Sequence, residues 1–331
     1  MTISQREELI EIIRRFEGCP ILVAGDVILD RFVWGDVQRI SPEAPVPVIE
    51  VKRESVHLGG AANVACNLAA LGASPRLVGL VGQDGAAREL RRELTHQGID
   101  ESGLISTSDR RTTTKTRIIA GHQQVCRADR EDRHPAQGSL LADLTGACRD
   151  RLSSCKAVIL SDYAKGVLVR DLVKLLIEQA SREGAYLAVD PKSRQFTDYR
   201  GASIITPNKK EAEAAAAMPI VDEDSLLQAG RRLRQEAELG ALLITRGEEG
   251  MTYLDADTHV HIPTAAREVY DVTGAGDTVT AVFTLAVACG ALPGQAAELA
   301  NHAAGIVVGK LGTSQVAAEE LIQSLDDAAM V

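Results

Sequence analysis

The fold is decided by residues 156–191, KAVILSDYAKGVLVRDLVKLLIEQASREGAYLAVDP. Two short apolar runs, KAVILSDY at 156–163 and AYLAVDP at 185–191, enclose the helical pattern RDLVKLLIEQASREG, which ends in Gly as helix C-termini often do. Apolar runs of this length are typical of strands that are buried on both faces. The stretch therefore predicts a strand, a helix and a second strand parallel to the first.

Further apolar runs of the same character recur along the chain. They are CPILVAGD at 19–26, RLVGLVG at 76–82, SIITPN at 203–208 and ALLITRG at 241–247. A second helical pattern, EDSLLQAGRRLRQEAELG at 223–240, also ends in Gly. Strands that alternate with helices predict an α/β fold with a mostly parallel central sheet covered on both faces. Ligands of such sheets bind in the crevice at the carboxyl ends of the strands.

Two segments interrupt this alternation. Residues 30–60 contain Pro42, Pro45 and Pro47 among alternating polar and apolar residues, which favours edge strands. Residues 110–132 have Gly121 between two strand-like runs, which favours a hairpin. We expect the two segments to form a small sheet that projects over the crevice as a lid. The alternative is a pair of ordinary surface hairpins.

The composition limits the class of protein and its partners. The 331 residues are 45% hydrophobic and 25% charged, which suits one large domain or a domain with a small appendage. The net charge of -10 argues against a nucleic acid or a membrane as partner, although a local basic pocket can still bind a phosphorylated small molecule. No apolar run reaches the roughly 20 residues that span a bilayer, and the first residues predict an amphipathic helix. We therefore expect a cytoplasmic protein.

The six cysteines form no CxxC pair, and most of them lie beside apolar residues. We expect reduced thiols packed in the core rather than a metal site or disulfides, since no ligand spacing is present. The cysteines are Cys19, Cys66, Cys126, Cys148, Cys155 and Cys289.

The stretch most informative about chemistry is DVTGAGDTVTAVF, residues 271–283. Gly274, Ala275 and Gly276 lead directly into a helical pattern, and such a turn presents backbone N–H groups and the positive end of the helix dipole to an anion. Asp277 lies in the first turn, where a carboxylate can accept a proton from an attacking hydroxyl. Phosphoryl transfer needs both features together. The alternative is a plain helix start with Asp277 as a capping residue.

Three motifs resemble those of the ribokinase family, also called the PfkB family of carbohydrate kinases. DVTGAGDTV resembles its second signature, HLGGAANVACNLAALG at 57–72 its first, and TPNKKEAE at 206–213 its Asn-x-x-Glu motif. They occur in the family's order and span most of the chain. The resemblance implies a ribokinase-like three-layer α/β/α domain over residues 1–331, with a β lid from about 31–56 and 110–129. It also implies ATP and Mg²⁺ as cofactors.

Roles for several residues follow from this resemblance. It implies that Asp277 is the catalytic base and that the backbone amides of Gly274–Gly276 form the anion hole. Asn208 and Glu211 correspond to the pair that arranges magnesium and the ATP phosphates, with Glu211 acting mainly through water. A contact through water suits Mg²⁺, which keeps several waters. The alternative for Glu211 is a solvated helix residue, which would be the preferred interpretation without Asn208.

The resemblance extends to the nucleotide and to a second cation. Thr245 and Gly247 correspond to strand-end residues near the nucleotide phosphates. Asn301 corresponds to a residue near the adenine, the alternative being an exposed helical Asn. Asp271 and the loop LGTSQ at 311–315 resemble a potassium site found in parts of the family.

A second set of polar residues is expected to bind sugar hydroxyls. Asp26 and Asp30 follow the first predicted strand, and Gly59, Gly60 and Asn63 belong to the first signature. Carboxylates and amides accept from and donate to neighbouring hydroxyls, so the set suits a polyol. For Asp26, a position in a surface turn is the alternative.

Several charged residues suggest a substrate that already carries a phosphate. Asp162 and Lys165 lie in SDYAKG and Lys192 in VDPKS, each just beyond a strand, while Arg117 and Arg127 lie in the expected lid. A sugar phosphate needs such cations, because its charge must be paired when the pocket closes. The alternative for each cation is a solvated surface group.

Longer stretches resemble one branch of the family. GDVILDRFVWGDVQRISPEAPVPV at 25–48, LSDYAKGVL at 160–168 and VDPKS resemble members that phosphorylate D-glycero-β-D-manno-heptose 7-phosphate. The resemblance implies transfer to the anomeric hydroxyl, which gives heptose 1,7-bisphosphate for the lipopolysaccharide core. Many relatives carry a nucleotidyltransferase domain after the kinase. Because no HxGH motif follows here, we expect kinase activity alone.

Three alternatives remain open from the sequence. The chain could phosphorylate another sugar phosphate, such as fructose 6-phosphate, or a nucleoside, or it could be a non-catalytic sensor of sugar phosphates. Intact Asp277, Asn208 and Glu211 favour an enzyme over a sensor. Apolar residues on the lid edge favour a homodimer that pairs through the lid. They include Val46, Val48 and Ile49.

Overall fold

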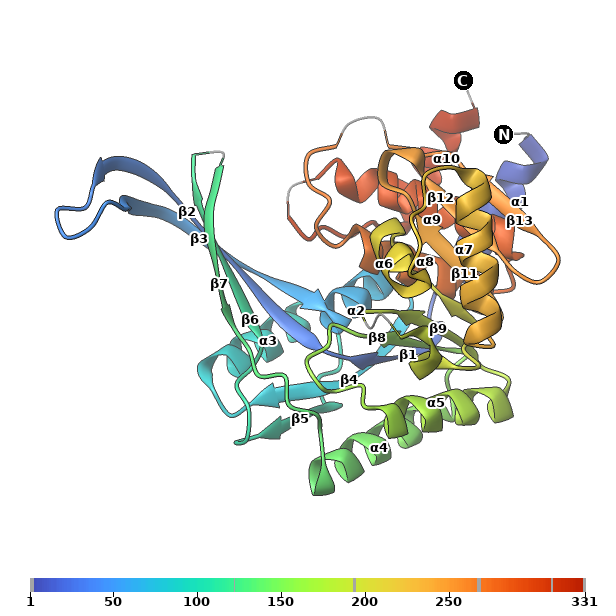
Figure 1. Ribbon diagram of the computed structural model, residues 1–331, viewed down its shortest axis with the longest axis horizontal. Coiled ribbons are helices and arrows are strands. Elements are labelled where there is room, and N and C mark those ends of the chain that lie inside the picture. The colour runs from blue at the N-terminus through green and yellow to red at the C-terminus, as the bar shows by residue number, and fades with distance from the viewer. Residues whose placement is uncertain (1–2, 122, 193–194, 267–268, 311, 330–331) are drawn as a thin grey trace.

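The computed structural model describes residues 3–121, 123–192, 195–266, 269–310 and 312–329, and it contains two sheets (Figure 1). The central sheet has nine strands in the order β13-β12-β11-β10-β9-β8-β1-β4-β5. All neighbours pair in parallel except the β11–β12 and β12–β13 pairs. The strands are β1 (Pro20–Gly25), β4 (Ser74–Gly82), β5 (Leu104–Thr107), β8 (Ala157–Ser161), β9 (Tyr186–Asp190), β10 (Ile204–Ile205), β11 (Ala241–Thr245), β12 (Met251–Leu254) and β13 (His259–Ile262). The predicted α/β class with a mostly parallel sheet is confirmed.

Helices cover both faces of the central sheet. One face carries α1 (Ile3–Arg14), α2 (Ala61–Ala70), α3 (Gly85–His96), α8 (Ala275–Ala288), α9 (Pro293–Val308) and α10 (Ala318–Ala329). The other carries α4 (Gly138–Leu152), α5 (Arg170–Glu183), α6 (Lys209–Ala216) and α7 (Glu223–Glu236). Along β1, Ile21 and Val23 enter the first core and Leu22 and Ala24 the second. This burial on both faces explains why the strands read as continuous apolar runs.

The stretch that decides the fold forms β8, α5 and β9, as predicted. β8 and β9 pair in parallel, with Ala157 opposite Tyr186. α5 ends at Gly184, whose φ of 68° is left-handed and favours glycine. The prediction holds because the helix packs one apolar side on strands that have no polar side.

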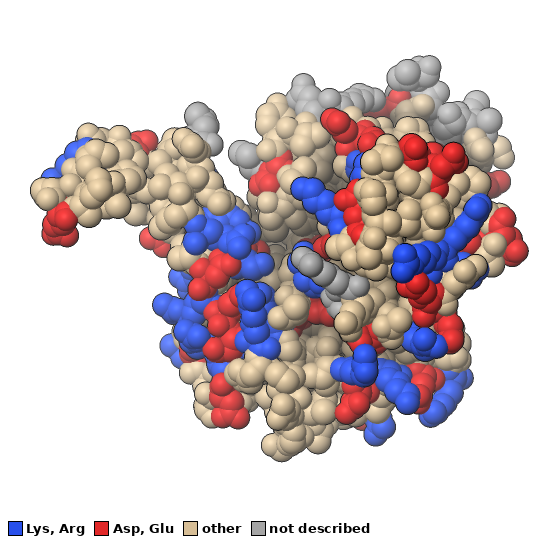
Figure 2. Space-filling model, viewed as in Figure 1, with Lys and Arg blue, Asp and Glu red and all other residues tan. Residues whose placement is uncertain are grey.

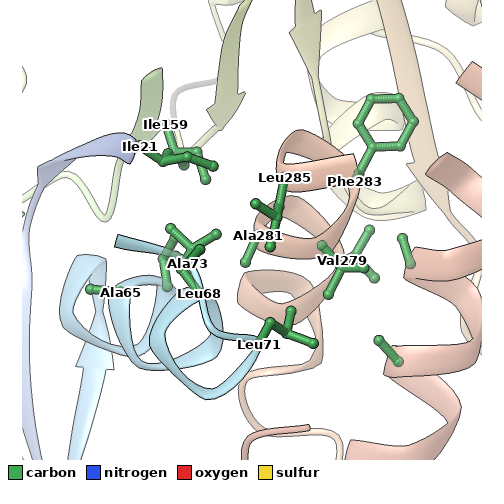
Figure 3. Packing of buried hydrophobic residues seen from close by; sticks show 14 of the residues in the cluster. Ile21, Ala65, Leu68, Leu71, Ala73, Ile159, Val279, Ala281, Phe283 and Leu285 are labelled. Atoms are coloured by element: carbon green, nitrogen blue, oxygen red, sulfur yellow. The ribbon is translucent and has the colours of Figure 1, made fainter. Parts of the chain in front are cut away.

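The packing of α8 against α2 forms the centre of the larger core (Figure 3). Figure 3 shows Leu68 of α2 and Leu71, the residue after α2, close to Ala281 and Leu285 of α8. The threonines of α8 are buried too, and Thr280 donates its hydroxyl to the Gly276 carbonyl at 3.1 Å. Since these hydroxyls are satisfied within the helix, α8 can be buried on all sides.

The second sheet is built from the two segments that interrupt the alternation. Its strands are β2 (Val27–Ile40), β3 (Pro47–Gly60), β6 (Thr114–Ala120) and β7 (Gln123–Arg130), in the order β3-β2-β6-β7. β2 and β6 are parallel, and the two outer pairs are antiparallel. β2 and β3 extend far beyond the main body as an arm (Figure 1). Closure of this sheet over the crevice stays a prediction.

The structure bears on two further expectations, that no segment spans a membrane and that the cysteines are thiols packed in the core. No helix in the described ranges is long and apolar enough to cross a membrane. All six cysteines are free thiols; Cys155 is half-buried, and the expectation of core packing is wrong for Cys126, which is exposed because it lies on the edge strand β7.

Phe283 tests the packing of α8. Its side chain is fully buried and its ring stacks on Tyr253 with centroids 6.2 Å apart. We expect Phe283→Ala to lower the free energy of unfolding by about 3–5 kcal/mol, because it removes apolar contacts and leaves a cavity. Denaturant unfolding measures the loss. Val221→Ala, at a side chain that is 77% exposed, should stay within about 0.5 kcal/mol and serves as the control. Equal losses in the two variants would contradict the packing.

Candidate active site

Polar side chains gather at the carboxyl edge of the central sheet. Asp26 follows β1, Asp162 follows β8, Asp190 ends β9, Asn208 follows β10 and Thr245 ends β11. Parallel strands bring their carboxyl ends to one edge, so residues far apart in sequence meet there. The first turns of α2 and α8 point to the same edge and complete the candidate site.

Asp277 is the centre of this site. One oxygen of its carboxylate accepts from Asn63 Nδ2 at 2.7 Å, and the other accepts from the Tyr163 hydroxyl at 2.8 Å. Burial raises the pKa of Asp277 to about 6, against the two hydrogen bonds, which favour the charged form. A carboxyl group with this pKa is ionised at neutral pH and can still take up a proton, as a general base must.

Glycine is required where α8 begins. Gly274 has a φ of 83°, and a Cβ on it would lie 2.8 Å from Asn63 Nδ2. A Cβ on Gly276 would meet nothing within 4 Å, so this side of the first turn faces open space. The Ala275 N–H makes only a long bond of 3.3 Å, to the Val272 carbonyl. The first-turn amides are therefore available to an anion, although their role as anion hole stays a prediction.

Asn63 comes from the first turn of α2, which starts after Gly60 with a φ of 58°. The side chain is fully buried, yet its Oδ1 has no hydrogen-bond partner among the residues that the structure describes. A buried carbonyl oxygen without a donor costs about 1–3 kcal/mol. A sugar hydroxyl is a donor of the right kind, in line with the prediction that Asn63 contacts the substrate.

A second hydrogen bond joins the same two helices. Thr278 donates its hydroxyl to Asn67 Oδ1 at 3.0 Å, and Asn67 Nδ2 donates to the Asn63 carbonyl at 3.0 Å. We did not expect Asn67 or Tyr163 to belong to the site. For Asn67 a signal existed, because it lies four residues after Asn63 and hence on the same face of α2.

Asp26 does not face the sugar pocket with free oxygens. Its buried carboxylate accepts from the backbone N–H groups of Tyr163, Lys165 and Val167, at 2.9, 3.0 and 3.2 Å. Burial raises the pKa of Asp26 despite these bonds. Asp26 thus holds the loop that carries Tyr163, a role that differs from the expected contact with sugar hydroxyls.

Asp162 also belongs to this loop. Its carboxylate accepts from the Ala164 N–H at 2.7 Å and from the Tyr199 hydroxyl. Burial raises its pKa. Ala164 has a φ of 55°, which is rare for a residue other than glycine. The loop is therefore tightly held on both sides of Tyr163.

Asp30 and Arg117 form a buried ion pair on the second sheet, with 7% and 14% of their side chains exposed. A Cβ on Gly59 would lie 2.2 Å from Asp30 Oδ2, so only glycine leaves room for this carboxylate. Arg127 is paired through two bonds to Asp129, at 2.8 and 2.9 Å. The two lid arginines lie where they were expected, each with a carboxylate partner on the same sheet.

Lys165 and Lys192 are paired as well. Lys165 Nζ lies 2.6 Å from a Glu131 oxygen, just after β7. Lys192 Nζ lies 3.0 Å from Glu211 Oε1. The structure thus brings Lys192 together with Asn208 and Glu211, the residues expected at the nucleotide phosphates.

Asn208 and Glu211 cap α6 reciprocally. Asn208 Oδ1 accepts from the Glu211 N–H at 3.0 Å, and Glu211 Oε2 accepts from the Asn208 N–H at 3.0 Å. Asp190, which sequence reasoning missed, lies nearby, and burial and the charge of Asp277 raise its pKa well above the usual range. Acidic groups therefore meet at this point, with Lys192 as a counter-charge.

Three of the residues expected to bind the nucleotide, Thr245, Gly247 and Asn301, line one cavity of about 400 Å³ together with Ala275 and Gly276. Asn208 and Glu211, expected at the ATP phosphates, are not among its lining residues. Much of the remaining lining is apolar, as a purine ring prefers. Asn301 is buried and its Nδ2 donates to the Pro263 carbonyl at 2.7 Å, so the alternative of an exposed helical Asn is wrong.

Asp271 fastens two loops. Its Oδ1 accepts from the Thr273 N–H at 2.9 Å, and its Oδ2 accepts from the Gly312 N–H at 3.1 Å. Leu311, the first residue of the loop predicted near a potassium ion, lies outside the described residues. The potassium site stays a prediction.

The space-filling view shows a hollow between the second sheet and the main body (Figure 2). On the face shown, basic and acidic side chains crowd the part of the molecule beside this hollow. The outer arm also carries exposed charged residues, Asp36, Arg39 and Lys52 among them.

A buried carboxylate between polar groups and a nucleotide-sized cavity is the arrangement that a kinase acting on a hydroxyl group requires. Residues 21–320 match the family model described as pfkB family carbohydrate kinase. The chain belongs to this family of carbohydrate kinases, as its three motifs predicted.

Similar proteins include the bifunctional protein HldE of Geobacter metallireducens. It is 49% identical over 305 residues, which are 92% of this chain and 62% of that protein. The bifunctional protein HldE of Caulobacter sp. (strain K31) is 50% identical over 318 residues, 96% of this chain and 64% of that protein. The chain therefore spans a little under two thirds of these curated relatives.

Solved structures share the fold. Ribokinase of Arabidopsis thaliana, complexed with ribose and ATP, has a TM-score of 0.75 and 18% identity, covering 93% of this chain and 99% of that one. Phosphofructokinase-2 of Escherichia coli, in complex with potassium, has a TM-score of 0.75 and 16% identity, covering 94% and 99%. The predicted ribokinase-like fold is confirmed.

Burial of Asp277 should cost stability above the pKa that it has in the unfolded chain. Between pH 4 and 6 the folded protein holds a proton that the unfolded chain releases, so stability falls as the pH rises. The rise of the pKa from 3.8 to about 6 corresponds to at most roughly 3 kcal/mol. We expect Asp277→Asn to be more stable than wild type at pH 8 by up to this amount.

Denaturant unfolding at pH 4 and pH 8 checks this prediction. The difference between the two proteins should be small at pH 4, where the carboxyl is protonated in the folded protein, and largest at pH 8. A variant that is less stable than wild type at pH 8 would contradict the account of Asp277 as a carboxylate that burial destabilises.

Proposed function

We propose that this chain transfers the γ-phosphoryl group of ATP to the anomeric hydroxyl of D-glycero-β-D-manno-heptose 7-phosphate. The product is heptose 1,7-bisphosphate, a precursor of the lipopolysaccharide core. The observation that carries the proposal is the Asp277 carboxylate, held by Asn63 and Tyr163 with a pKa of about 6. The choice of sugar is supported by the resemblance of residues 25–48 and 160–168 to the heptose branch and by the likeness to the HldE proteins.

In the proposed reaction Asp277 takes the proton of the sugar hydroxyl as its oxygen attacks the γ-phosphorus. The new O–P bond forms while the bond from the γ-phosphorus to the bridging oxygen breaks, and ADP leaves with that oxygen. The first-turn amides of α8, at Gly274–Gly276, stabilise the charge on the moving group. Asn63 and Tyr163 keep the carboxylate aimed at the hydroxyl.

ATP lies in the cavity beside Thr245, Gly247 and Asn301, with its phosphates toward α8. Mg²⁺ is the metal that this chemistry implies. In the described parts of the chain no group of three or more His, Cys, Asp or Glu side chains could hold a metal ion directly. Glu211 therefore fits a magnesium ion held through water, which also leaves its bond to Asn208 intact. When bound, the ion neutralises phosphate charge.

The phosphate of the sugar has to compete for cations that are already paired. Arg117, Arg127 and Lys165 lie on or beside the second sheet, and each contacts a carboxylate. The phosphate replaces one or more of these carboxylates when the sheet closes. An arginine is suited to this exchange because its planar head can bind a phosphate through two hydrogen bonds. The exchange favours a phosphorylated sugar over a free one.

The arm supports a proposed homodimer of a cytoplasmic enzyme. Val37, Ile40, Val46 and Val51 are 42%, 61%, 51% and 50% exposed on an extension that rests on no other part of the described chain. Exposed apolar residues on a long strand pair favour association with another copy. A second copy of this chain offers a matching surface by symmetry.

The first experiment measures ADP release with ATP, Mg²⁺ and a panel of sugars. We expect turnover with heptose 7-phosphate and little with fructose 6-phosphate, ribose or adenosine. Asp277→Asn should lower kcat by about 10²–10⁴-fold while the fold is kept, because only the proton acceptor is lost. Turnover with fructose 6-phosphate alone would show that the proposed substrate is wrong. Near-normal turnover of Asp277→Asn would show that Asp277 is not the base.

The dimer is tested by light scattering after size-exclusion chromatography. The wild type should have twice the chain mass of 35.3 kDa, and Ile40→Asp combined with Val46→Asp should have the mass of one chain. Charges on the arm disfavour burial of this surface. Val221→Asp, at an exposed residue of the main body, is the control and should leave the mass unchanged.

A further inference from the structure

The registers of the second sheet place charged side chains in a row across its four strands. Asp30 pairs with His57 on β3 and with Lys115 on β6, and Lys115 pairs with Asp129 on β7. Residues that are directly opposite one another share a face of the sheet. Lys115 therefore lies between two carboxylates, Asp30 and Asp129.

Neither carboxylate is left for Lys115. Asp30 is bound by Arg117, and Asp129 by Arg127. Among the described residues, no carboxylate oxygen lies within ion-pair distance of Lys115 Nζ; the contact found is with the ring of Tyr163, 5.4 Å away. The side chain is half-buried, and desolvation lowers its pKa. Lys115 is thus a partly desolvated ammonium group that makes no ion pair in the described structure, although the charge of Asp30 acts on it, and it lies next to the residue that bonds Asp277.

The environment of Asp277 gives this cation a role. The titratable groups that face the carboxylate are Asp30 from β2, Tyr163 from the loop after β8 and Asp190 from β9, with Lys115 from β6. Asp30 is paired with Arg117, and burial raises the pKa of Asp190. Lys115 is the uncommitted positive charge in this set, and its charge lowers the pKa of Asp277.

We propose that Lys115 is the positioning residue through which the second sheet keeps Asp277 ionised. From the strand β6 its ammonium group lies over the Tyr163 ring, and Tyr163 donates to the carboxylate. The cation stabilises the carboxylate form of the base and holds the tyrosine in place. A sheet that approaches the crevice brings the charge closer, which lowers the pKa of Asp277 further and favours its ionised form. The proposal rests on the proposed role of Asp277 but not on the identity of the sugar.

The test is the pH dependence of kcat/KM for Lys115→Met, because kcat/KM reports the ionisation of the free enzyme. The measurement uses ATP, Mg²⁺ and whichever sugar of the panel the wild type phosphorylates, so a wrong substrate leaves it valid. We expect the acid limb of the profile to move up by about one pH unit, because loss of the Lys115 charge raises the pKa of Asp277. The rate should recover at higher pH, where Asp277 is ionised. Lys115→Arg should keep the wild-type limb.

Arg130→Met is the matched control. Arg130 lies on the same sheet but on its opposite face, where it lines a separate cavity with Thr114 and Thr116. Its loss should leave the acid limb in place. If the acid limb of the kcat/KM profile stays in place in Lys115→Met, the proposal is overturned, even if kcat/KM is lower by the same factor at every pH. An equal shift of the acid limb in Arg130→Met would also overturn it. If Lys115→Met disturbs the folding of the second sheet, Lys115→Gln is the second variant. A shifted acid limb in this variant supports the proposal, and an unshifted one overturns it.

Discussion

The hydrogen bond between Asn63 and Asp277 is the constraint on which the rest of the site depends. It joins the first turns of two helices across 214 residues of sequence, over a distance of 2.7 Å. Both helices start at glycines with positive φ, Gly60 and Gly274, and a Cβ on Gly274 would occupy the space next to the Asn63 amide. The glycines of both signatures are therefore needed to bring the base to its partner, as well as to leave backbone N–H groups open for an anion.

Much of the fold could be predicted because its strands are buried on both faces. β1, β8, β9 and β11 have no polar side, so they appear in the sequence as apolar runs that end in the polar residues of the site. The turn at 274–277 and the other two motifs predicted the family, while the role of Asp277 as base stays a prediction. Partners within the site could not be predicted. A carboxylate after a strand looks the same in sequence whether it binds a hydroxyl or, as Asp26 does, three amides 137 to 141 residues away.

The same limit applies to the cations. Sequence placed Arg117, Arg127 and Lys165 near the crevice but said nothing of their carboxylate partners, because pairing depends on strand register. The register of β6 is what separates Lys115 from these three. Its neighbours across the sheet are acidic, yet both are taken by arginines that reach them from nearby positions. An ion pair that exists before the substrate arrives lowers the gain from binding a phosphate, since one partner must first be replaced.

In the proposed reaction Asp277 changes its charge in every turnover, and the helices that hold it must not loosen. The contact between α2 and α8 meets this demand because most of it does not depend on the charge of Asp277. Thr278 and Asn67 are neutral, and their hydrogen bond persists whether Asp277 is a carboxylate or a carboxylic acid. Leu68 and Leu285 pack below them in a core that no water reaches. Only the bonds from Asn63 and Tyr163 change strength as the proton arrives. Neutral contacts thus keep Asp277 buried, and this burial raises its pKa. The free-energy cost of burying its charge therefore falls on Asp277 and not on the contacts between the two helices.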